Sequence, residues 1–386
     1  MIVGIVGGGQ LARMLALAGT PLGLRFVFLD PADDACAAPL GEHLCAAYDD
    51  RDALARLATL ADCVTFEFEN VPADSLVNEL AERVPLYPAP AALAVAQDRL
   101  SEKHLFHRLN IPTAPFAKVD CRADLDRAAS EIGFPAVLKT RRLGYDGKGQ
   151  TVLRIAGDLD KAWQIQGGTP LILEAFVPFD REISLLAARG RSGQVVYYPL
   201  SENTHSDGIL RQSLSRPGDA LQALAEDFTR RLLDDLDYVG VLALECFDVG
   251  GQLLANELAP RVHNSGHWTI EGAETSQFEN HLRAILNLPL GATTPVGRCA
   301  MVNLIGTLPE AARVLTRPGA HLHVYGKRPR PGRKLGHVTL RAADERSMQN
   351  ELRLLLGLVT ESLNSSATNS SRRGGAEVSG EVRRFS

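Results

Sequence analysis

The residues best suited to metal chemistry lie in the segment 243–267, where two apolar runs are separated by Gly250 and Gly251. Two apolar runs joined by two glycines are typical of a β-hairpin. In such a hairpin Glu245 and Glu257 fall opposite or nearly opposite each other, on one face of the strand pair. Two carboxylates on one face repel unless a cation lies between them, and a few hard oxygen ligands suit Mg²⁺. A solvated hairpin is the alternative, but the apolar neighbours of both glutamates argue against a wet strand.

A polar cluster begins beside the second of these glutamates and continues after it in the chain. Its members carry amide, guanidinium and imidazole groups: Asn256, Arg261, His263, Asn264 and His267. All of these groups can donate hydrogen bonds to an anion. Carboxylates for a metal that run straight into donors for an anionic substrate indicate nucleotide-driven chemistry.

A glycine-rich loop at 142–150, with the sequence RLGYDGKGQ, lies between two predicted strands. Its glycines leave backbone amides exposed, so the loop can fold over a polyphosphate and exclude water. Lys139 ends the preceding strand and would bring a positive charge to the phosphates. The segment is not a Walker A motif, because no Gly-Lys-Ser/Thr precedes a helix. A surface hairpin loop is the alternative, and the buried type of strand before it favours the phosphate loop.

A second glycine cluster, Gly7, Gly8 and Gly9, follows the first predicted strand and opens a helix. With Asp30 at the end of the next strand, it fits a dinucleotide-binding fingerprint. The residues themselves indicate only a phosphate-binding site, since any phosphorylated small molecule can bind glycine amides at a helix N-terminus. A tight turn with no ligand is the third interpretation.

Several weaker candidates remain open between a binding role and a structural one. Glu67 and Glu69 end the third predicted strand, where a sugar hydroxyl or plain solvent can meet them. The strand 171–177 contains Glu174 and is followed by Glu182, which fits an adenine and ribose site or an ordinary edge strand. The remaining candidates are phosphate ligands or solvated polar surface: His205, Lys327, Arg333 and Lys334.

Composition excludes several classes of protein. A net charge of −5 over 386 residues gives no basic footprint for nucleic acid. Six scattered cysteines without a C-x-x-C pair argue against a zinc site or a disulfide framework, and fit a reducing compartment. No apolar run reaches transmembrane length, and the N-terminus lacks the features of a signal peptide. A cytoplasmic protein without a membrane partner is therefore expected.

The order of predicted elements divides the chain into four parts. Residues 1–97 alternate strands (2–6, 24–29, 63–68) with helices (10–18, 52–60, 73–84), which predicts an α/β domain with a parallel, Rossmann-like sheet. Residues 98–290 form an α+β domain with a mostly antiparallel sheet: strands at 136–140, 150–155, 171–176, 182–189 and 194–199, and helices at 158–166 and 221–236. A small C-terminal domain, 291–363, has strands at 299–305, 321–324 and 337–341 and a last helix. The Ser-, Gly- and Arg-rich segment 364–386 is predicted to be a disordered tail.

Taken together, these residues resemble the ATP-grasp superfamily and, within it, the N5-carboxyaminoimidazole ribonucleotide synthetases of purine synthesis. The resemblance runs from residue 1 to about residue 360. It depends on six motifs that occur in order: GGGQLARM, TFEFENV, QDRLSEK, GYDGKGQ, ECF…NELAPRVHNSGHWT and RPGRKLGH. It implies an ATP-grasp fold preceded by a Rossmann-like pre-ATP-grasp domain and followed by a small C-terminal domain.

The resemblance also implies roles for matching positions. The ATP-binding set would be Arg99, Lys139, Gly144, Tyr145, Asp146, Gly147, Lys148, Gly149, Gln150, Glu174, Ala175, Phe176, Val177, Glu182, His205, Asn256 and Glu257. Glu245 and Glu257 would bind Mg²⁺, with Mn²⁺ as a substitute. The substrate-binding set would be Gln10, Glu67, Asn70, Arg261, His263, Asn264, Lys327, Arg333 and Lys334. Catalytic positions would be Tyr145, Asp146, Lys148, Arg261 and His263, with His263 and Asp146 as candidate bases.

The implied reaction is the ATP-dependent carboxylation of aminoimidazole ribonucleotide with bicarbonate, through carboxyphosphate. The resemblance also implies a homodimer and a separate mutase that receives the product. Lys148 stands where many relatives carry Arg, and Ala175 replaces a larger residue. Another ATP-grasp ligase, such as the formate-using purine transformylase, is the nearer alternative, and an NAD-dependent oxidoreductase is the more distant one.

Overall fold

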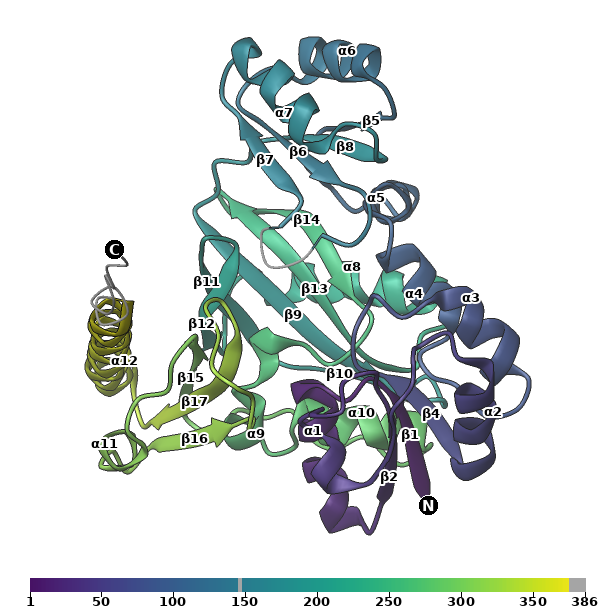
Figure 1. The fold of residues 1–386 in the computed structure, drawn as a ribbon, viewed down its shortest axis with the longest axis vertical. Helices are drawn as coiled ribbons and strands as arrows, with labels where there is room; N and C mark the ends of the chain where they lie inside the picture. Colours follow the sequence, from purple (N-terminus) through teal and green to yellow (C-terminus); the bar gives the residue numbers. More distant parts are fainter. Residues whose placement is uncertain (145–147, 375–386) are drawn as a thin grey trace, which may run out of the picture.

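The computed structural model describes residues 1–144 and 148–374, so Tyr145, Asp146 and Gly147 lie outside the described residues, as does the segment 375–386. Figure 1 shows three connected parts: a small sheet with two helices at the top, a long central sheet, and the N-terminal domain at the lower right. Among the described residues, no helix is long and apolar enough to cross a membrane.

The N-terminal domain contains a four-stranded parallel sheet, which confirms the predicted Rossmann-like architecture. Its strand order is β3-β2-β1-β4, with β1 (Ile2–Val6), β2 (Arg25–Leu29), β3 (Glu42–Leu44) and β4 (Cys63–Phe66). The main helices are α1 (Gln10–Gly19), α2 (Arg51–Leu60) and α3 (Ala73–Leu76), and α3 continues into the π-helical turn η3 (Val77–Ala81). Short 3₁₀ turns follow α1 and β2: η1 (Thr20–Leu22) and η2 (Ala38–Leu40).

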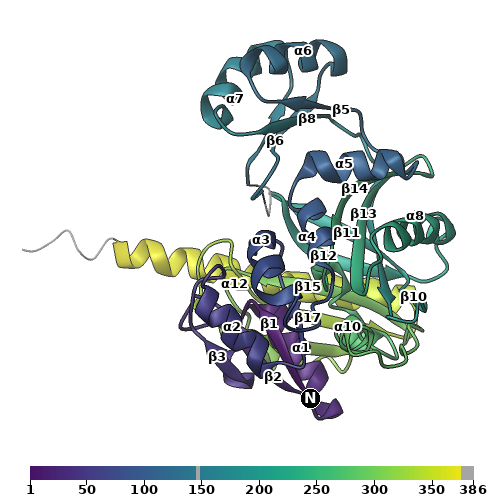
Figure 2. The ribbon, with the colours of Figure 1, turned by 90° about the vertical axis from the view of Figure 1, so that its right-hand side faces the viewer.

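The upper part is an antiparallel sheet of order β5-β8-β6-β7. Its strands are β5 (Phe116–Val119), β6 (Ala136–Thr140), β7 (Gln150–Leu153) and β8 (Leu171–Ala175). Two helices cover one face of this sheet, α6 (Arg122–Ile132) and α7 (Leu159–Gln166), with the turn η4 (Ala156–Asp158) before α7 (Figure 2). Helices α4 (Pro90–Ala96) and α5 (Arg99–Arg108) connect the N-terminal domain to this part.

The large sheet has nine strands, and its path is β14-β13-β9-β11-β12-β15-β17-β16, with β10 paired to β9. Its first half contains β9 (Arg181–Arg189), β10 (Val195–Tyr197), β11 (Leu200–Ser206), β12 (Ile209–Arg216), β13 (Gly240–Val249) and β14 (Gln252–Ala259). The strands β13 and β14 are the predicted hairpin. The helices of this half of the large sheet are α8 (Gln222–Asp235), α9 (Thr269–Gly272) and α10 (Gln277–Ile285). The 3₁₀ turn η5 (Asn264–Gly266) follows the hairpin.

The C-terminal strands extend this sheet, across the boundary predicted at residue 291. They are β15 (Arg298–Ile305), β16 (Ala320–Val324) and β17 (Lys334–Ala342), and β12 pairs with β15. Helix α11 (Ala311–Leu315) lies beside β16, and α12 (Glu345–Gly374) packs on β15 and β17 and then extends away from the body (Figure 2). The structure therefore differs from the predicted disordered tail at 364–374, where Ser, Ala, Asn and Arg residues continue the helix rather than end it.

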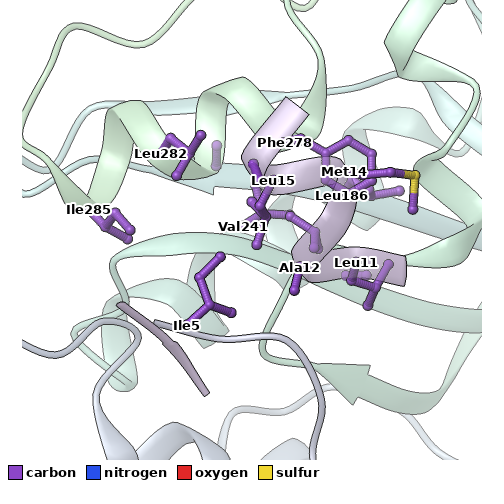
Figure 3. Close-up of a cluster of buried hydrophobic side chains, with 14 of the residues drawn as sticks. Ile5, Leu11, Ala12, Met14, Leu15, Leu186, Val241, Phe278, Leu282 and Ile285 are labelled. Atoms are coloured by element: carbon purple, nitrogen blue, oxygen red, sulfur yellow. The ribbon is translucent and has the colours of Figure 1, made fainter. Parts of the chain in front are cut away.

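The buried core fixes the N-terminal domain against the large sheet. In Figure 3, side chains of α1 such as Leu11 and Leu15 meet Phe278 and Leu282 of α10 and Val241 of β13. Helix α1 is amphipathic because its apolar residues recur at helical spacing and turn toward this cluster. The packing sets the position of the N-terminal end of α1, and with it the glycine loop that precedes the helix.

Candidate active site

A cavity of about 690 Å³ lies where the three parts meet. Most of the predicted site residues line it, from segments as far apart as α1 and β17: Gln10, Glu67, Asn70, Arg99, Lys139, Gly144, Lys148, Gln150, Glu174, Ala175, Phe176, Val177, Glu182, His205, Glu245, Asn256, Glu257, Arg261, His263, Asn264, Lys327 and Lys334. Gly149 and Arg333 are not among the lining residues.

The two hairpin glutamates oppose each other directly, as their spacing predicts. Glu245 pairs with Glu257 across β13 and β14, and the register then shifts so that Asn256 is the additional residue of a β-bulge. Bulges next to active sites re-aim side chains, and here the bulge leaves Asn256 and Glu257 both on the cavity wall. Each carboxylate makes a close contact with a basic side chain: Arg99 Nη1 donates to Glu257 at 3.0 Å, and His263 Nε2 lies 3.3 Å from Glu245.

The pKa values of the pair move in opposite directions. Burial, and then repulsion from Glu257, raises the pKa of Glu245. Burial also acts to raise the pKa of Glu257, but the positive charges of Arg99 and Lys139 outweigh it and lower that pKa. One carboxylate is thus held ionised while its partner resists ionisation, which is the electrostatic situation that a cation would relieve.

Two lysines hold Glu174 at the end of β8. Lys139 Nζ donates to Glu174 Oε2 at 3.0 Å, and Lys103 Nζ lies 3.6 Å from the same oxygen. Burial opposes ionisation of Glu174, but both lysines overcome it and lower its pKa to about 2. Lys103 is fully buried and also donates to the carbonyl of Asn256 at 2.7 Å, so it joins the small sheet to the hairpin. Sequence reasoning missed Lys103, although it belongs to the QDRLSEK motif.

Helix α5 positions Arg99 through a cap that reaches the small sheet. Asp98 accepts from the backbone N–H of Leu100 at 3.0 Å, which caps the helix. The same carboxylate accepts two bonds from Arg141, at 2.9 and 2.5 Å. Because Arg99 directly follows this cap, its guanidinium reaches the hairpin from a fixed point.

The described ends of the glycine-rich loop close against β6. The backbone N–H of Thr140 donates to the carbonyl of Gly149 at 2.8 Å. Gly149 has a φ of +74°, and a Cβ there would lie 2.5 Å from Thr140 Oγ1. Glycine is therefore required at 149 by both conformation and space.

The polar cluster after Glu257 presents hydrogen-bonding groups without a protein partner. Arg261 pairs with Glu69 at 2.8 Å, yet its Nε is buried and unpartnered. Asn264 Nδ2 and Asn256 Oδ1 are likewise buried without a partner. A buried unsatisfied polar group is costly, so these three atoms mark where a polar ligand would bind.

Histidine environments in the site are unlike each other. His205 pairs with Glu182, and this bond raises the pKa of His205 against the opposing effect of burial. Burial, then the positive charge of Arg261 and Lys334, lowers the pKa of His263 well below its ordinary value. His263 is therefore a neutral imidazole near pH 7. His267, predicted beside it, is fully buried and packs on Phe278 and His337, away from the cavity.

The N-terminal glycine loop uses its amides internally. Gly9 N–H donates to Glu67 Oε1 at 2.6 Å, and Ala12 N–H donates to Glu67 Oε2 at 2.9 Å. Gly8 N–H donates to Asp30 Oδ2 at 2.7 Å. A Cβ on Gly9 would lie 2.4 Å from Glu67 Oε1, so the glycine makes room for the carboxylate. The dinucleotide interpretation is wrong, because the amides and the acid that it needs are bonded to each other.

The C-terminal basic residues separate into two groups. Lys327 donates to Gln10 Oε1 at the start of α1, and Lys334 lines the cavity at the start of β17. Arg333 turns away and donates to the carbonyl of Arg328 at 3.2 Å. The structure thus brings Gln10, Lys327 and Lys334 to the site, but not Arg333.

Family models match three consecutive segments of the chain. Residues 1–97 match the ribonucleotide synthetase preATP-grasp domain, residues 104–278 the ATP-grasp domain, and residues 299–351 the phosphoribosylaminoimidazole carboxylase C-terminal domain. A curated relative from Pseudomonas aeruginosa, named N5-carboxyaminoimidazole ribonucleotide synthase, is 59% identical over 349 residues, which are 90% of this chain and 97% of the relative. The chain belongs to the N5-carboxyaminoimidazole ribonucleotide synthase family.

Solved structures of this synthase family share the fold. The crystal structure of the synthetase from Thermus thermophilus has 57% sequence identity and a TM-score of 0.89, covering 92% of this chain and 98% of its own. A synthase from Aspergillus clavatus, solved in complex with ADP and 5-aminoimidazole ribonucleotide, has 30% identity and a TM-score of 0.86, covering 93% and 98%. The ATP-grasp fold with its parallel pre-ATP-grasp domain is thereby confirmed, and the chain is an ATP-dependent ligase.

Proposed function

We propose that this synthase carboxylates 5-aminoimidazole ribonucleotide with bicarbonate and ATP, and releases N5-carboxyaminoimidazole ribonucleotide, ADP and phosphate. The observation that carries the proposal is one cavity with two chemically different ends. One end holds the opposed carboxylates with Arg99 and Lys139 nearby, and the other holds the unpartnered Arg261 Nε and Asn264 Nδ2. The Aspergillus relative was solved with ADP and the ribonucleotide together.

The nucleotide end combines an apolar slot with fixed positive charge. Phe179 and Phe247 stack with ring centroids 4.9 Å apart and line the cavity near β8. The N–H groups of Ala175 and Phe176 already donate to Pro115 and Pro135, so we assign the adenine edge to the backbone of Val177. We assign the phosphates to Lys139 and Arg99, and the ribose to Glu182. ATP-binding roles for Gly144, Lys148 and Gln150 are supported by their place on the cavity wall.

Mg²⁺, or Mn²⁺ in its place, fits the hairpin. Glu245 and Glu257 supply hard oxygen ligands at low count, which leaves room for phosphate oxygens. Their direct opposition and the raised pKa of Glu245 are the observations that support a cation. The ion would neutralise charge on the transferring phosphoryl group. Arg99 and His263 keep both carboxylates oriented.

The substrate end would bind two anions. We assign bicarbonate to Arg261 Nε and Asn264 Nδ2, which are buried without a protein acceptor, and the ribonucleotide phosphate to Lys327 and Lys334. In the proposed reaction, bicarbonate oxygen attacks the γ-phosphorus and ADP leaves. The exocyclic amine of the ribonucleotide then attacks the carbonyl carbon of carboxyphosphate, or the CO₂ formed from it, and phosphate leaves. Water must be excluded during these steps, because it destroys the intermediate.

Three further proposals concern the setting of the reaction. We propose a homodimer, which light scattering on purified protein would test. We propose that a separate mutase consumes the product. We propose a cytoplasmic location, and the six free cysteines of the described structure support it, because disulfides are rare in reducing compartments.

A coupled assay of ADP release tests the function. We expect release with ATP, Mg²⁺ and bicarbonate to rise strongly when aminoimidazole ribonucleotide is added. A rate that the ribonucleotide does not change would refute the assignment. The same assay tests the transformylase alternative when formate replaces bicarbonate and glycinamide ribonucleotide is the acceptor.

A further inference from the structure

A row of buried polar side chains runs from the middle of the large sheet to the ring of His263. Ser213 Oγ lies 2.7 Å from Asn203 Oδ1, and Asn203 Nδ2 lies 3.0 Å from Ser184 Oγ. Ser184 Oγ lies 2.6 Å from Ser265 Oγ, which lies 2.8 Å from His263 Nδ1. The three serines are fully buried and Asn203 nearly so. The ATP, metal and substrate assignments do not use these four residues.

One fixed donor sets the direction of every hydrogen bond in this row. The backbone N–H of Ser265 points at His263 Nδ1 from 3.3 Å. A backbone N–H can only donate, so Nδ1 must present its lone pair. The Ser265 hydroxyl then donates to the same nitrogen and accepts from Ser184. Asn203 donates to Ser184 and accepts from Ser213, so every hydrogen points toward the imidazole.

We propose that these four residues are positioning residues that fix His263 as the neutral tautomer with hydrogen on Nε2: Ser213, Asn203, Ser184 and Ser265. The opposite tautomer would place a hydrogen on Nδ1 against the Ser265 N–H. Nε2–H therefore faces Glu245 Oε1, 3.3 Å away. The imidazole donates to the hairpin carboxylate and cannot accept a proton from the substrate at that nitrogen.

The sheet register explains why this row of hydrogen bonds ends at Glu245. Ser184 of β9 is directly opposite Glu245 of β13 and also opposite Ser201 of β11, so these side chains share one face. Turn η5 brings His263 and Ser265 over that face. Gly266 allows the close approach, because a Cβ there would lie 2.2 Å from Leu186 Cδ2. Gln277 holds the His263 backbone from the other side, with bonds of 2.8 and 2.6 Å.

The catalytic consequence rests on the proposed function, but the tautomer does not. If Glu245 binds Mg²⁺, the Nε2–H bond orients this ligand from outside the metal's coordination sphere. Partners of that kind affect metal affinity or activity by about 10- to 100-fold. His263 is then a donor that holds the carboxylate, and the base role expected from the family resemblance does not fit it.

Side-chain ¹H–¹⁵N correlations of histidine-labelled protein, without nucleotide or metal, test the tautomer directly. The His263 signals would be assigned by their loss in His263→Asn. We expect hydrogen on Nε2 and none on Nδ1 in the wild type. In Ser265→Ala the 2.8 Å hydroxyl contact is lost and only the longer backbone N–H bond of 3.3 Å holds the Nδ1 lone pair, so we expect part of the population to carry hydrogen on Nδ1. Hydrogen on Nδ1 in the wild type, or an unchanged pattern in Ser265→Ala, would overturn the proposal.

A matched control comes from the same strand as Ser213. Ser215 is also buried on β12, but its hydroxyl accepts from the N–H of Cys299 at 3.2 Å and does not belong to the row that reaches His263. We expect Ser215→Ala to keep the wild-type tautomer and kcat. Ser265→Ala should lower kcat about tenfold with the KM for ATP unchanged, and Ser184→Ala should lower it less. Equal kcat values in Ser265→Ala and Ser215→Ala would refute the positioning role. Absence of ribonucleotide-stimulated activity in the wild type would refute only the proposed function, since the NMR result stands without it.

Discussion

The N-terminal glycine loop and the β13–β14 hairpin both combine glycines with acidic residues, but they use the acids in opposite ways. In the glycine loop, Glu67 and Asp30 accept bonds from backbone N–H groups of the loop and complete a turn. In the hairpin, Glu245 and Glu257 lie side by side on one face of the strand pair and line the cavity, with basic side chains as their neighbours. Residue types alone make both regions look like ligand sites.

The difference shows that glycines and acids do not by themselves distinguish a binding site from a turn, because the availability of their hydrogen-bonding groups also matters. Amides that already donate to a carboxylate have nothing to offer a phosphate, whatever the glycine spacing. Around the hairpin, Arg261 Nε, Asn264 Nδ2 and Asn256 Oδ1 stay buried and unpartnered. Leaving such groups unpaired costs stability. A ligand that bonds to them near the hairpin would remove this cost, whereas the amides of the glycine loop are already paired.

The largest expected effect is the loss of activity in Glu257→Gln. An amide keeps the shape of the side chain but removes the charge that faces Arg99 and the proposed metal. We expect ribonucleotide-stimulated ADP release to fall more than about 100-fold, the upper effect of losing an outer partner of a metal site. Thermal unfolding should show a folded chain. Near-normal turnover in this variant would contradict the metal role, and Glu131→Gln, at an exposed glutamate, is the control.

Glu67→Ala should produce the largest loss of stability among the acids compared. The substitution leaves the buried N–H groups of Gly9 and Ala12 without an acceptor, at a cost of about 1–3 kcal/mol each. We expect the free energy of unfolding in urea to fall by about 2–6 kcal/mol. If Glu67 served chiefly as a sugar ligand, activity would fall while the unfolding curve matched that of Glu131→Ala.

Glu245→Gln should change stability in the opposite direction, and its effect should depend on pH. Burial and Glu257 raise the pKa of Glu245 in the folded chain, above the unfolded value of about 4.3. The stability that the protonated carboxyl contributes is complete below that value and is lost as pH rises. Without metal, we therefore expect the variant to gain stability over the wild type between about pH 5 and pH 8, on the order of 1 kcal/mol. A difference that does not change with pH would contradict this assignment of the charge.

Asp30→Asn should have the smallest effect. An amide oxygen can still accept from Gly8 N–H, but a bond to a neutral acceptor is about half as strong as one to a carboxylate. The amide nitrogen replaces the oxygen that accepts from Ala32 N–H at 2.8 Å, and this exposed N–H can bond to water instead. We expect a loss of about 0.5–1 kcal/mol in urea unfolding and unchanged ADP release. A strong rise in the KM for any substrate would instead place Asp30 at the ligand.

Local patterns predicted the elements with strong periodicity or a clear hairpin signal. The hairpin, helix α8 and the parallel N-terminal sheet were read from the order of apolar residues. Helix α6 was missed, although Leu125, Ala128, Ala129 and Ile132 recur at helical spacing and could have revealed it. Strand β3, with the sequence EHL, has no alternation over its three residues and gave no signal.

Tertiary structure decided which polar groups remained available. The sequence by itself determined that Glu245 and Glu257 share a face, because side chains alternate along a strand and a two-glycine turn limits the register. It also determined that a parallel N-terminal sheet precedes a mostly antiparallel region, because periodicity is a local property. Only the folded chain decided that Glu67 and Asp30 bond to glycine amides, that Lys103 joins two sheets, and that four buried residues reach His263. Asp30 lies 22 residues from Gly8 along the chain, and Lys103 lies 153 residues from Asn256. Hydrogen-bond satisfaction depends on which surfaces the core brings together, and no spacing within one segment encodes that.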